Sequence, residues 1–136
     1  MPPKKSLYKP RDPVVILTDK DIKGTRITQK GTKAKPCYDG VVKVYASWCP
    51  HCIEKVSSIN AIAGAFKKLG MKQTMYVIDG DANPVFARAS GIEGFPSFFP
   101  VVNGFIDTGR RISGGVTDVL GHMCQSCIGR PEFRLN

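Results

Sequence analysis

The chain has 136 residues, of which 42% are hydrophobic, so it is long enough for one domain with a core and too short for two. It has no run of about 18 apolar residues, the length that a membrane-spanning helix needs. Its first residues lack the apolar stretch of a secretory signal. We therefore expect a cytoplasmic protein without a transmembrane segment.

The positive charge is concentrated near the N-terminus. Residues 1–35 carry ten Lys and Arg against three Asp, so they hold +7 of the formal net charge of +9. This basic segment could dock on a nucleic acid, an anionic membrane or an acidic protein surface, or it could be a solvated arm. It lacks an aromatic-rich motif that reads bases, so a nucleic acid is an unsupported partner. The residues concerned are Lys20, Lys23, Arg26, Lys30, Lys33 and Lys35.

The first third of the chain predicts an arm and two strands. Residues 1–12 contain three prolines and four basic residues, which is typical of an extended basic arm. Residues 14–17 form a β-branched run and predict a strand, whereas residues 24–35 are too poor in apolar residues for any periodicity and predict a loop or a weak strand. Residues 41–46 predict a second strand, which leads directly to Cys49.

The rest of the chain alternates helices and strands. Apolar residues between 53 and 69 recur at spacings of three to four, which predicts one helix that Gly70 ends. Asn83 and Pro84 supply an N-cap and a first-turn proline for a short helix. Further strands are predicted at residues 75–78, 97–102 and 105–107, and further helices at 84–90 and from 117 to before Pro131. This order indicates an α/β domain over residues 13–125, with a mixed central sheet covered by helices on both faces, and a tail at 126–136.

Five cysteines without a secretory signal point to redox or metal chemistry rather than to a structural disulfide framework. Cys49 and Cys52 form one Cys-x-x-Cys pair, Cys124 and Cys127 form another, and Cys37 stands alone. The first pair lies where a predicted strand meets a predicted helix. A cysteine at a helix N-terminus has its thiolate stabilised by unpaired backbone N–H groups and by the helix dipole.

The residues between the two cysteines fit a reversible disulfide. Pro50 occupies the first turn, where its missing N–H is not needed, and His51 can act on charge near the Cys49 sulfur. The spacing lets Cys52 reach Cys49 and resolve a mixed disulfide formed there. A zinc site completed by His51 and His122 is the alternative. The strand-to-helix position favours redox chemistry, so we expect neither a metal nor a cofactor.

The sequence from Val44 to Cys52 resembles the active-site segment of thioredoxins and protein disulfide isomerases. The resemblance continues through residues 77–79, 83–84, 91–97 and 103–104 in family order, and it covers about residues 13–125. It implies a thioredoxin fold of three α/β/α layers, with protein thiols and disulfides as substrates.

The same resemblance implies roles for particular residues. Cys49 attacks or is attacked, Cys52 resolves, and His51 and Pro50 tune the pair. It also implies a cis peptide bond at Phe95–Pro96, where Trp48, Phe95 and Pro96 line a substrate groove; an ordinary loop proline is the alternative. The Pro-His pair is similar to that of the bacterial periplasmic oxidant, which suggests an oxidant or isomerase of protein disulfides.

Three features depart from the family pattern. Lys43 stands where the family usually has a buried acid, so it either snorkels to the surface or is held neutral. Pro100 lies inside a predicted strand and implies a bulge. The usual first helix is hard to find between residues 24 and 35.

The second Cys pair and the basic arm leave two functions open. Cys124 and Cys127 predict a local disulfide, an electron relay through a tail, or a link to a partner chain, with metal binding less favoured. Cys37 is most simply a lone thiol. The alternative to a redox enzyme is a thioredoxin-fold structural component, held among neighbouring chains by the arm and the second Cys pair. A virus particle assembled in the cytoplasm is one example of such an assembly.

Overall fold

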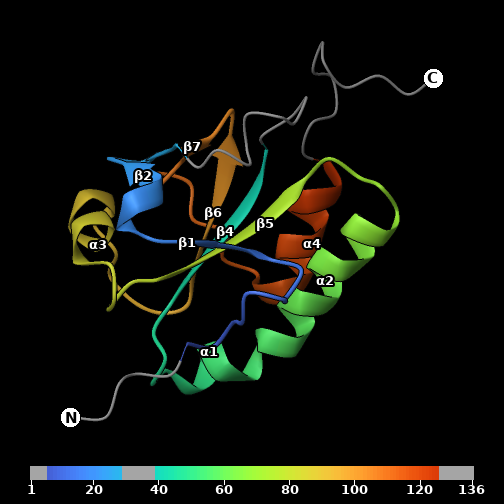
Figure 1. Cartoon of the computed structure of the whole chain (residues 1–136), viewed down its shortest axis with the longest axis horizontal. Coiled ribbons are helices and arrows are strands. Elements are labelled where there is room, and N and C mark those ends of the chain that lie inside the picture. The colour runs from blue at the N-terminus through green and yellow to red at the C-terminus, as the bar shows by residue number, and fades with distance from the viewer. Residues whose placement is uncertain (1–5, 29–38, 126–136) are drawn as a thin grey trace.

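A mixed seven-stranded sheet organises the molecule (Figure 1). The computed structural model describes residues 6–28 and 39–125. In this part of the chain the strands follow the order β1-β5-β4-β6-β7-β3-β2 across the sheet. Their bounds are β1 Val15–Leu17, β2 Ile22–Lys23, β3 Arg26–Ile27, β4 Gly40–Tyr45, β5 Thr74–Asp79, β6 Ser97–Val102 and β7 Phe105–Ile106.

Strand β4 is the centre of the sheet. It runs parallel to β5 and antiparallel to β6, and all six of its residues are buried. Strands covered on both faces are typically continuous β-branched runs, and β4 reads Gly-Val-Val-Lys-Val-Tyr. The exception in this run is Lys43, which therefore lies in the middle of the sheet with its side chain in the core.

Helices cover both faces of the sheet, so the fold has three α/β/α layers, as the order of elements predicted. The helices are α1 Pro50–Glu54, α2 Val56–Lys68, α3 Pro84–Ser90 and α4 Gly115–Gln125, with a 3-10 turn, η1, at Asp19–Asp21. Helices α2 and α4 lie side by side on one face, and α3 lies on the other (Figure 1). Ile59, Phe66 and Met123 belong to the core cluster of the first face, whereas Phe86 belongs to that of the second.

The helix predicted over residues 53–69 is interrupted. Helix α1 ends at Glu54 and α2 begins at Val56, with Lys55 between them at φ −91° and ψ −1°. The spacing of apolar residues continues from Ile53 across this break to Val56, although Ile53 is 50% exposed and Val56 packs against the core. A sequence pattern of burial therefore does not reveal where the backbone bends.

Pro100 does not cause the bulge that the sequence predicted. The register of β6 with β4 is regular, and Pro100 lies opposite Val41. The Pro100 carbonyl accepts from the Asp107 N–H at 2.9 Å, so its nitrogen faces the same side, beyond the end of β7. The missing N–H thus falls where the β7 ladder has ended, and no hydrogen bond to β4 is lost.

The described part of the N-terminal arm packs on the domain. Tyr8 is 1% exposed, and its ring lies 5.4 Å from that of Tyr45 in an edge-to-face contact. Leu7 packs against the same core cluster. Leu7 and Tyr8 of the predicted arm therefore belong to the folded domain, whereas residues 9–11 are exposed. One aromatic ring in a basic segment buries enough apolar surface to dock it.

The N-terminus of α3 is capped from a distant part of the chain. Asn83 occupies the predicted N-cap position, but its side chain bonds to the Asp19 N–H and the Asp79 carbonyl instead of the helix. The Asp19 carboxylate accepts from the N–H groups of Val85 and Phe86 at 3.2 and 2.9 Å. This carboxylate satisfies free donors at the helix start and has the favoured sign of charge there.

Gly40 lets β4 approach β5 closely. A Cβ atom at this position would overlap the backbone carbonyl of Thr74. We expect Gly40→Ala to lower the free energy of unfolding by about 3 kcal/mol, measured by urea denaturation. The control is Gly121→Ala on the exposed face of α4, where a Cβ meets nothing within 4 Å and stability should rise slightly. Equal effects of the two substitutions would contradict this account.

Candidate redox site

The two cysteines lie at the junction of β4 with α1, as the sequence predicted. The Cys49 N–H donates to the Ala46 carbonyl at 3.1 Å, which turns the chain after the strand. Cys49 is the N-cap of α1, and Pro50 occupies its first turn. The geometry thus places the first sulfur at the start of a helix, where unpaired N–H groups are available.

Both sulfurs are thiols and both are buried. The Cys52 N–H donates to Cys49 Sγ at 3.2 Å, and the Cys49 thiol lies 3.6 Å from the Phe95 carbonyl. Cys49 is 3% exposed and Cys52 is fully covered. A substrate can therefore reach Cys49 first, and only after the side chains around it shift.

The predicted groove residues lie together beside Cys49. Trp48 is 60% exposed, and its ring meets that of Phe95 edge to face at 5.9 Å. Trp48 Nε1 donates to the Asp81 carboxylate. The Phe95–Pro96 peptide bond is cis. The site thus has an apolar wall at one side of the Cys49 sulfur, anchored by a surface carboxylate.

Gly80 makes room for this wall. A Cβ at Gly80 would lie 2.6 Å from the Phe95 ring, and the Gly80 N–H donates to the Tyr45 carbonyl at 2.7 Å. The segment after β5 is therefore fixed to the end of β4 while it leaves space for the aromatic ring. Sequence reasoning missed both Gly80 and Asp81, because neither belongs to a recognisable motif.

His51 faces solvent. Its Nδ1 lies 3.3 Å from Glu54 Oε2, one turn further along the helix, and both side chains are more than 70% exposed. The sequence predicted that His51 acts on charge near the Cys49 sulfur. The contact in the structure is with a surface carboxylate, so any effect on the sulfur acts through space.

Lys43 is the unexpected member of the site. The sequence left open whether this side chain snorkels or is held neutral, and the structure buries it completely. Its Nζ donates to the Tyr8 hydroxyl at 2.7 Å and to the Cys52 carbonyl at 2.9 Å, so it does not reach the surface. Nζ also lies 5.0 Å from the centre of the Tyr8 ring. Tyr8 itself was not predicted as a site residue.

Burial shifts the protonation of this cluster toward neutral forms. Burial lowers the pKa of Lys43 from 10.5 to about 8, against the opposing attraction of the Cys52 and Cys49 sulfurs. Burial and the hydrogen bond with Cys49 raise the pKa of the Cys52 thiol to about 12, although Lys43 acts in the other direction. Burial also raises the pKa of Tyr8, so its hydroxyl stays neutral. Of Lys43, Cys52 and Tyr8, Lys43 is therefore the group whose pKa lies nearest to neutral pH.

The other predicted residues fall outside this centre. Cys124 is an exposed free thiol on α4, and Cys37 and Cys127 lie outside the described residues, so the predicted second disulfide stays a prediction. Within residues 6–28 and 39–125, no three His, Cys, Asp or Glu side chains gather as metal ligands would. No helix in the same ranges is long and apolar enough to span a bilayer.

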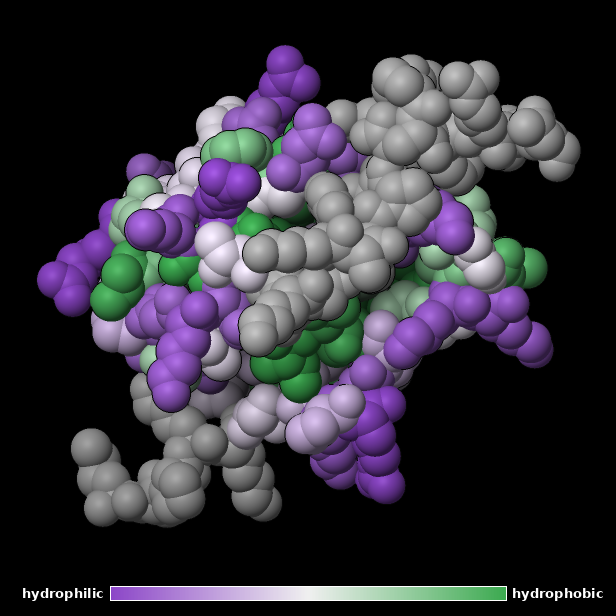
Figure 2. All heavy atoms as spheres, turned by 45° about the horizontal axis from the view of Figure 1, so that its top comes forward, coloured by the Kyte–Doolittle hydropathy of each residue, from purple (hydrophilic) through white to green (hydrophobic). Residues whose placement is uncertain are grey.

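The described basic residues lie at the far edge of the sheet. Lys20, Lys23 and Arg26 are exposed on η1, β2 and β3, and the Arg26 guanidinium lies 5.6 Å from the Phe105 ring centre. Lys30, Lys33 and Lys35 lie outside the described residues. On the face in Figure 2, hydrophilic side chains cover most of the periphery and hydrophobic ones gather near the centre.

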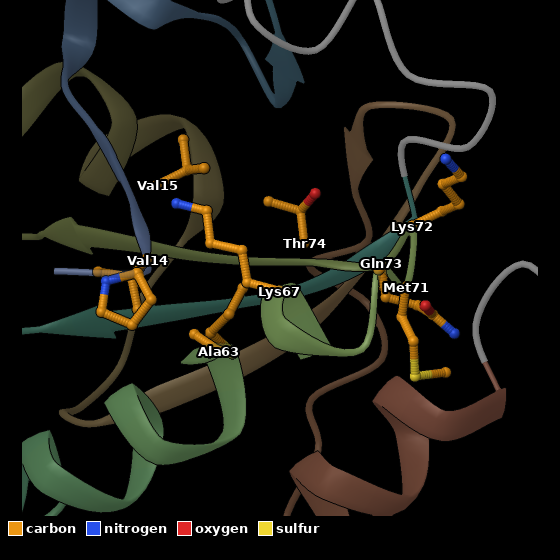
Figure 3. Close-up of a pocket in the computed structure, with 11 residues that line it drawn as sticks. Val14, Val15, Ala63, Lys67, Met71, Lys72, Gln73 and Thr74 are labelled. Carbon is orange, nitrogen blue, oxygen red and sulfur yellow. The ribbon is translucent and has the colours of Figure 1, made fainter. Parts of the chain in front are cut away.

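A separate hollow lies beside the first residues of β1 and β5 (Figure 3). It has a volume of about 380 Å³ and is bordered by Val14, Met71, Lys67 and Lys72. It meets the start of β5 at Thr74, whereas the dithiol follows the end of the parallel strand β4. This hollow therefore does not belong to the redox site.

The buried amine makes stability depend on pH. Because the pKa of Lys43 is lower in the folded chain, the unfolded chain binds more protons between pH 8 and 10.5, and stability rises with pH there. Between pH 8 and 10.5, we expect the free energy of unfolding of the parent protein to rise by about 3 kcal/mol more than that of Lys43→Met. Both proteins carry Cys49→Ser and Cys52→Ser so that neither thiol of the pair titrates, and denaturation is followed by circular dichroism.

Lys68→Met, at the exposed end of α2, controls for the loss of one positive charge. Its stability difference from the parent should stay constant with pH. A flat difference for Lys43→Met as well would show that Lys43 is not desolvated in the folded protein.

Comparison with known proteins agrees with this architecture. The thioredoxin family model matches residues 29–124. Sulfhydryl oxidase 1 from Pongo abelii and from Homo sapiens are each 29% identical over 121 residues, which cover 88% of this chain. The chain spans about 15% of the length of these curated relatives.

Solved structures show the same fold. The zinc-bound form of human ERp44 superposes with a TM-score of 0.65 at 16% identity, over 82% of this chain and 30% of ERp44. Trichomonas vaginalis thioredoxin superposes with a TM-score of 0.62 at 24% identity, over 84% of this chain and 97% of that protein. With its mixed sheet, its flanking helices and a Cys-x-x-Cys pair at the start of α1, the chain belongs to the thioredoxin family.

Proposed function

We propose that this chain is a thiol–disulfide oxidoreductase that acts on protein disulfides as an oxidant or isomerase. The observation that carries the proposal is the hydrogen bond from the Cys52 N–H to Cys49 Sγ, which fixes the Cys49 sulfur at the helix start, over the residue that carries the second thiol. A sulfur that accepts from a backbone N–H is better stabilised as a thiolate. The similarity to sulfhydryl oxidase 1 supports the same class of chemistry.

In the oxidant direction, a substrate thiolate attacks Cys49 Sγ of the Cys49–Cys52 disulfide. The new bond joins the substrate sulfur to Cys49, and Cys52 leaves as a thiolate that takes up a proton. A second substrate thiolate then attacks the first substrate sulfur, and Cys49 leaves. Two electrons pass from the two substrate sulfurs to Cys49 and Cys52, and a disulfide-bearing partner has to reoxidise the pair.

The Trp48–Phe95 wall supports an extended polypeptide as the substrate. Exposed Trp48 offers apolar contact beside Cys49, and the Phe95 carbonyl lies 3.6 Å from the Cys49 sulfur. An unfolded segment carrying a cysteine could pack on the indole while its sulfur reaches Cys49. Asp81 keeps the indole in this position through its hydrogen bond to Nε1.

A structural role is the second candidate, favoured by the near-complete burial of Cys49. In this function the domain is a component of a larger assembly, such as a virus particle, with weak redox activity. Neighbouring chains would be bound by the basic arm and the second Cys pair. The two functions differ in whether Cys49 exchanges with protein disulfides.

Removal of the resolving cysteine tests the leading proposal. We expect Cys52→Ser to accumulate mixed disulfides through Cys49 with a model protein whose disulfides are scrambled, because the Cys49 thiolate attacks a substrate disulfide and no second cysteine releases it; non-reducing gels and mass spectrometry detect the products. Cys124→Ser, which removes an exposed thiol on α4, is the control and should accumulate none. If Cys52→Ser and the parent protein both fail to exchange with any thiol or disulfide, the structural role is favoured.

The direction of electron flow follows from the reduction potential of the Cys49–Cys52 pair. We expect a value tens of millivolts above about −270 mV, the potential of thioredoxin, because a stabilised thiolate favours the reduced form. Equilibration with glutathione buffers, followed by alkylation and mass spectrometry, measures it. A value at or below that of thioredoxin would indicate a reductant.

A further inference from the structure

A buried amine and a buried thiol lie next to each other, and the charged groups that act on this amine are the two cysteine sulfurs and Lys55. Lys43 Nζ donates to the carbonyl of Cys52 itself at 2.9 Å, and both side chains are fully covered. The Tyr8 hydroxyl accepts from the same nitrogen at 2.7 Å. These two acceptors fix Nζ beside the second cysteine of the pair.

The groups around Lys43 come from every segment packed against it. Tyr8 belongs to the N-terminal segment and Tyr45 to β4, and their ring centres lie 5.0 and 6.0 Å from Nζ. Helix α1 contributes the two thiols, and Lys55 follows it. Helices α2 and α4 add apolar side chains to the same core cluster. Two carboxylates, Asp12 and Asp79, act on the two tyrosine hydroxyls. The groups that attract a charged Lys43 are the Cys52 and Cys49 sulfurs.

We propose that Lys43 is a catalytic residue whose Nζ accepts the proton that Cys52 loses as it attacks a mixed disulfide on Cys49, and that Tyr8 is the positioning residue that keeps this nitrogen in place. The proposal deepens the proposed function and rests on it, because it requires a reversible Cys49–Cys52 pair.

Resolution of the mixed disulfide combines a proton transfer with a thiol–disulfide exchange. The Cys52 thiol loses its proton to the neutral amine of Lys43, which leaves a thiolate beside an ammonium. The Cys52 thiolate forms a bond to Cys49 Sγ, and the bond between Cys49 and the substrate sulfur breaks. The substrate leaves as a thiolate that takes a proton from water, and Lys43 releases its proton to solvent. In the reverse direction, the Lys43 ammonium gives a proton to the departing Cys52 sulfur.

In the buried site, a Cys52 thiolate and a Lys43 ammonium that form together cost less free energy than the two charges would cost if each formed alone. Burial raises the pKa of Cys52 to about 12 and lowers the pKa of Lys43 to about 8, so each charge is disfavoured by itself. Formed together, the two charges attract each other in a medium that screens them weakly. The reactive pair of thiolate and ammonium has one proton fewer than the fully protonated state. Its population therefore rises with pH and levels off once that proton is lost, near pH 8.

The test is the pH profile of the resolving step. Reduced protein is mixed with saturating glutathione disulfide, and formation of the Cys49–Cys52 disulfide is followed by Trp48 fluorescence and by acid quench with mass spectrometry. In the parent protein we expect the rate to rise with pH and to level off near pH 8. In Lys43→Met we expect no plateau near this pH and a rate at pH 7 lower by about tenfold, the effect of one unit in the pKa of Cys52.

Two further variants keep the outcome interpretable if Lys43→Met folds poorly. Tyr8→Phe keeps the ring that packs on Tyr45 but removes the hydroxyl that accepts from Nζ, so the plateau should begin at lower pH. Lys68→Met, at the exposed end of α2, should match the parent. A plateau that is unchanged in both Lys43→Met and Tyr8→Phe overturns the proposal. Absence of disulfide exchange in the parent at any pH instead overturns the proposed function.

Discussion

One buried nitrogen joins three segments that are far apart in the chain. Lys43 on the central strand β4 donates to Tyr8 in the N-terminal segment and to Cys52 in α1. A buried amine without acceptors is strongly unfavourable, so the positions of these three segments depend on one another. Strand β4 places the Lys43 amine, which donates to the Tyr8 hydroxyl and to the Cys52 carbonyl at the start of α1. The Cys52 N–H in turn donates to the sulfur of Cys49. The arrangement of the dithiol therefore depends on residues well outside the Cys-x-x-Cys motif.

Local sequence patterns predicted the elements whose burial is regular. β4, α2 and the hairpin of β6 with β7 follow from β-branched runs, apolar spacing and the Asn103-Gly104 turn. The features that the sequence did not reveal depend on contacts between distant residues. Asp19 caps a helix that begins 65 residues later, and nothing near Pro84 indicates which carboxylate will do so. The break at Lys55 is hidden because the apolar spacing continues through it and no Pro or Gly marks it.

The candidate site also contains residues that the sequence predicted and residues whose role depends on distant contacts. Cys49, Cys52, Trp48 and Phe95 were predicted from the motif and the family resemblance, and the structure brings them together. The fate of Lys43 could not be derived from its position alone, because a lysine in a central strand can snorkel or stay buried. The buried position is stabilised by the Tyr8 hydroxyl, which accepts a hydrogen bond from Lys43 and lies 35 positions away from it in the chain. A single aromatic residue in a proline-rich basic segment gives no periodic signal from which to infer burial.

The docking of Tyr8 also shows that the folded domain extends beyond the part of the chain that matches the family model. The part of the chain that matches the thioredoxin family model starts at residue 29, yet the core includes Tyr8. A fragment cut at the start of that match would keep both sulfurs but would lose strands β1, β2 and β3 together with the tyrosine that accepts from the buried amine. The folded domain is therefore larger than the family match. In such a fragment the amine beneath the dithiol would have no hydroxyl acceptor, although the Cys-x-x-Cys motif would be complete.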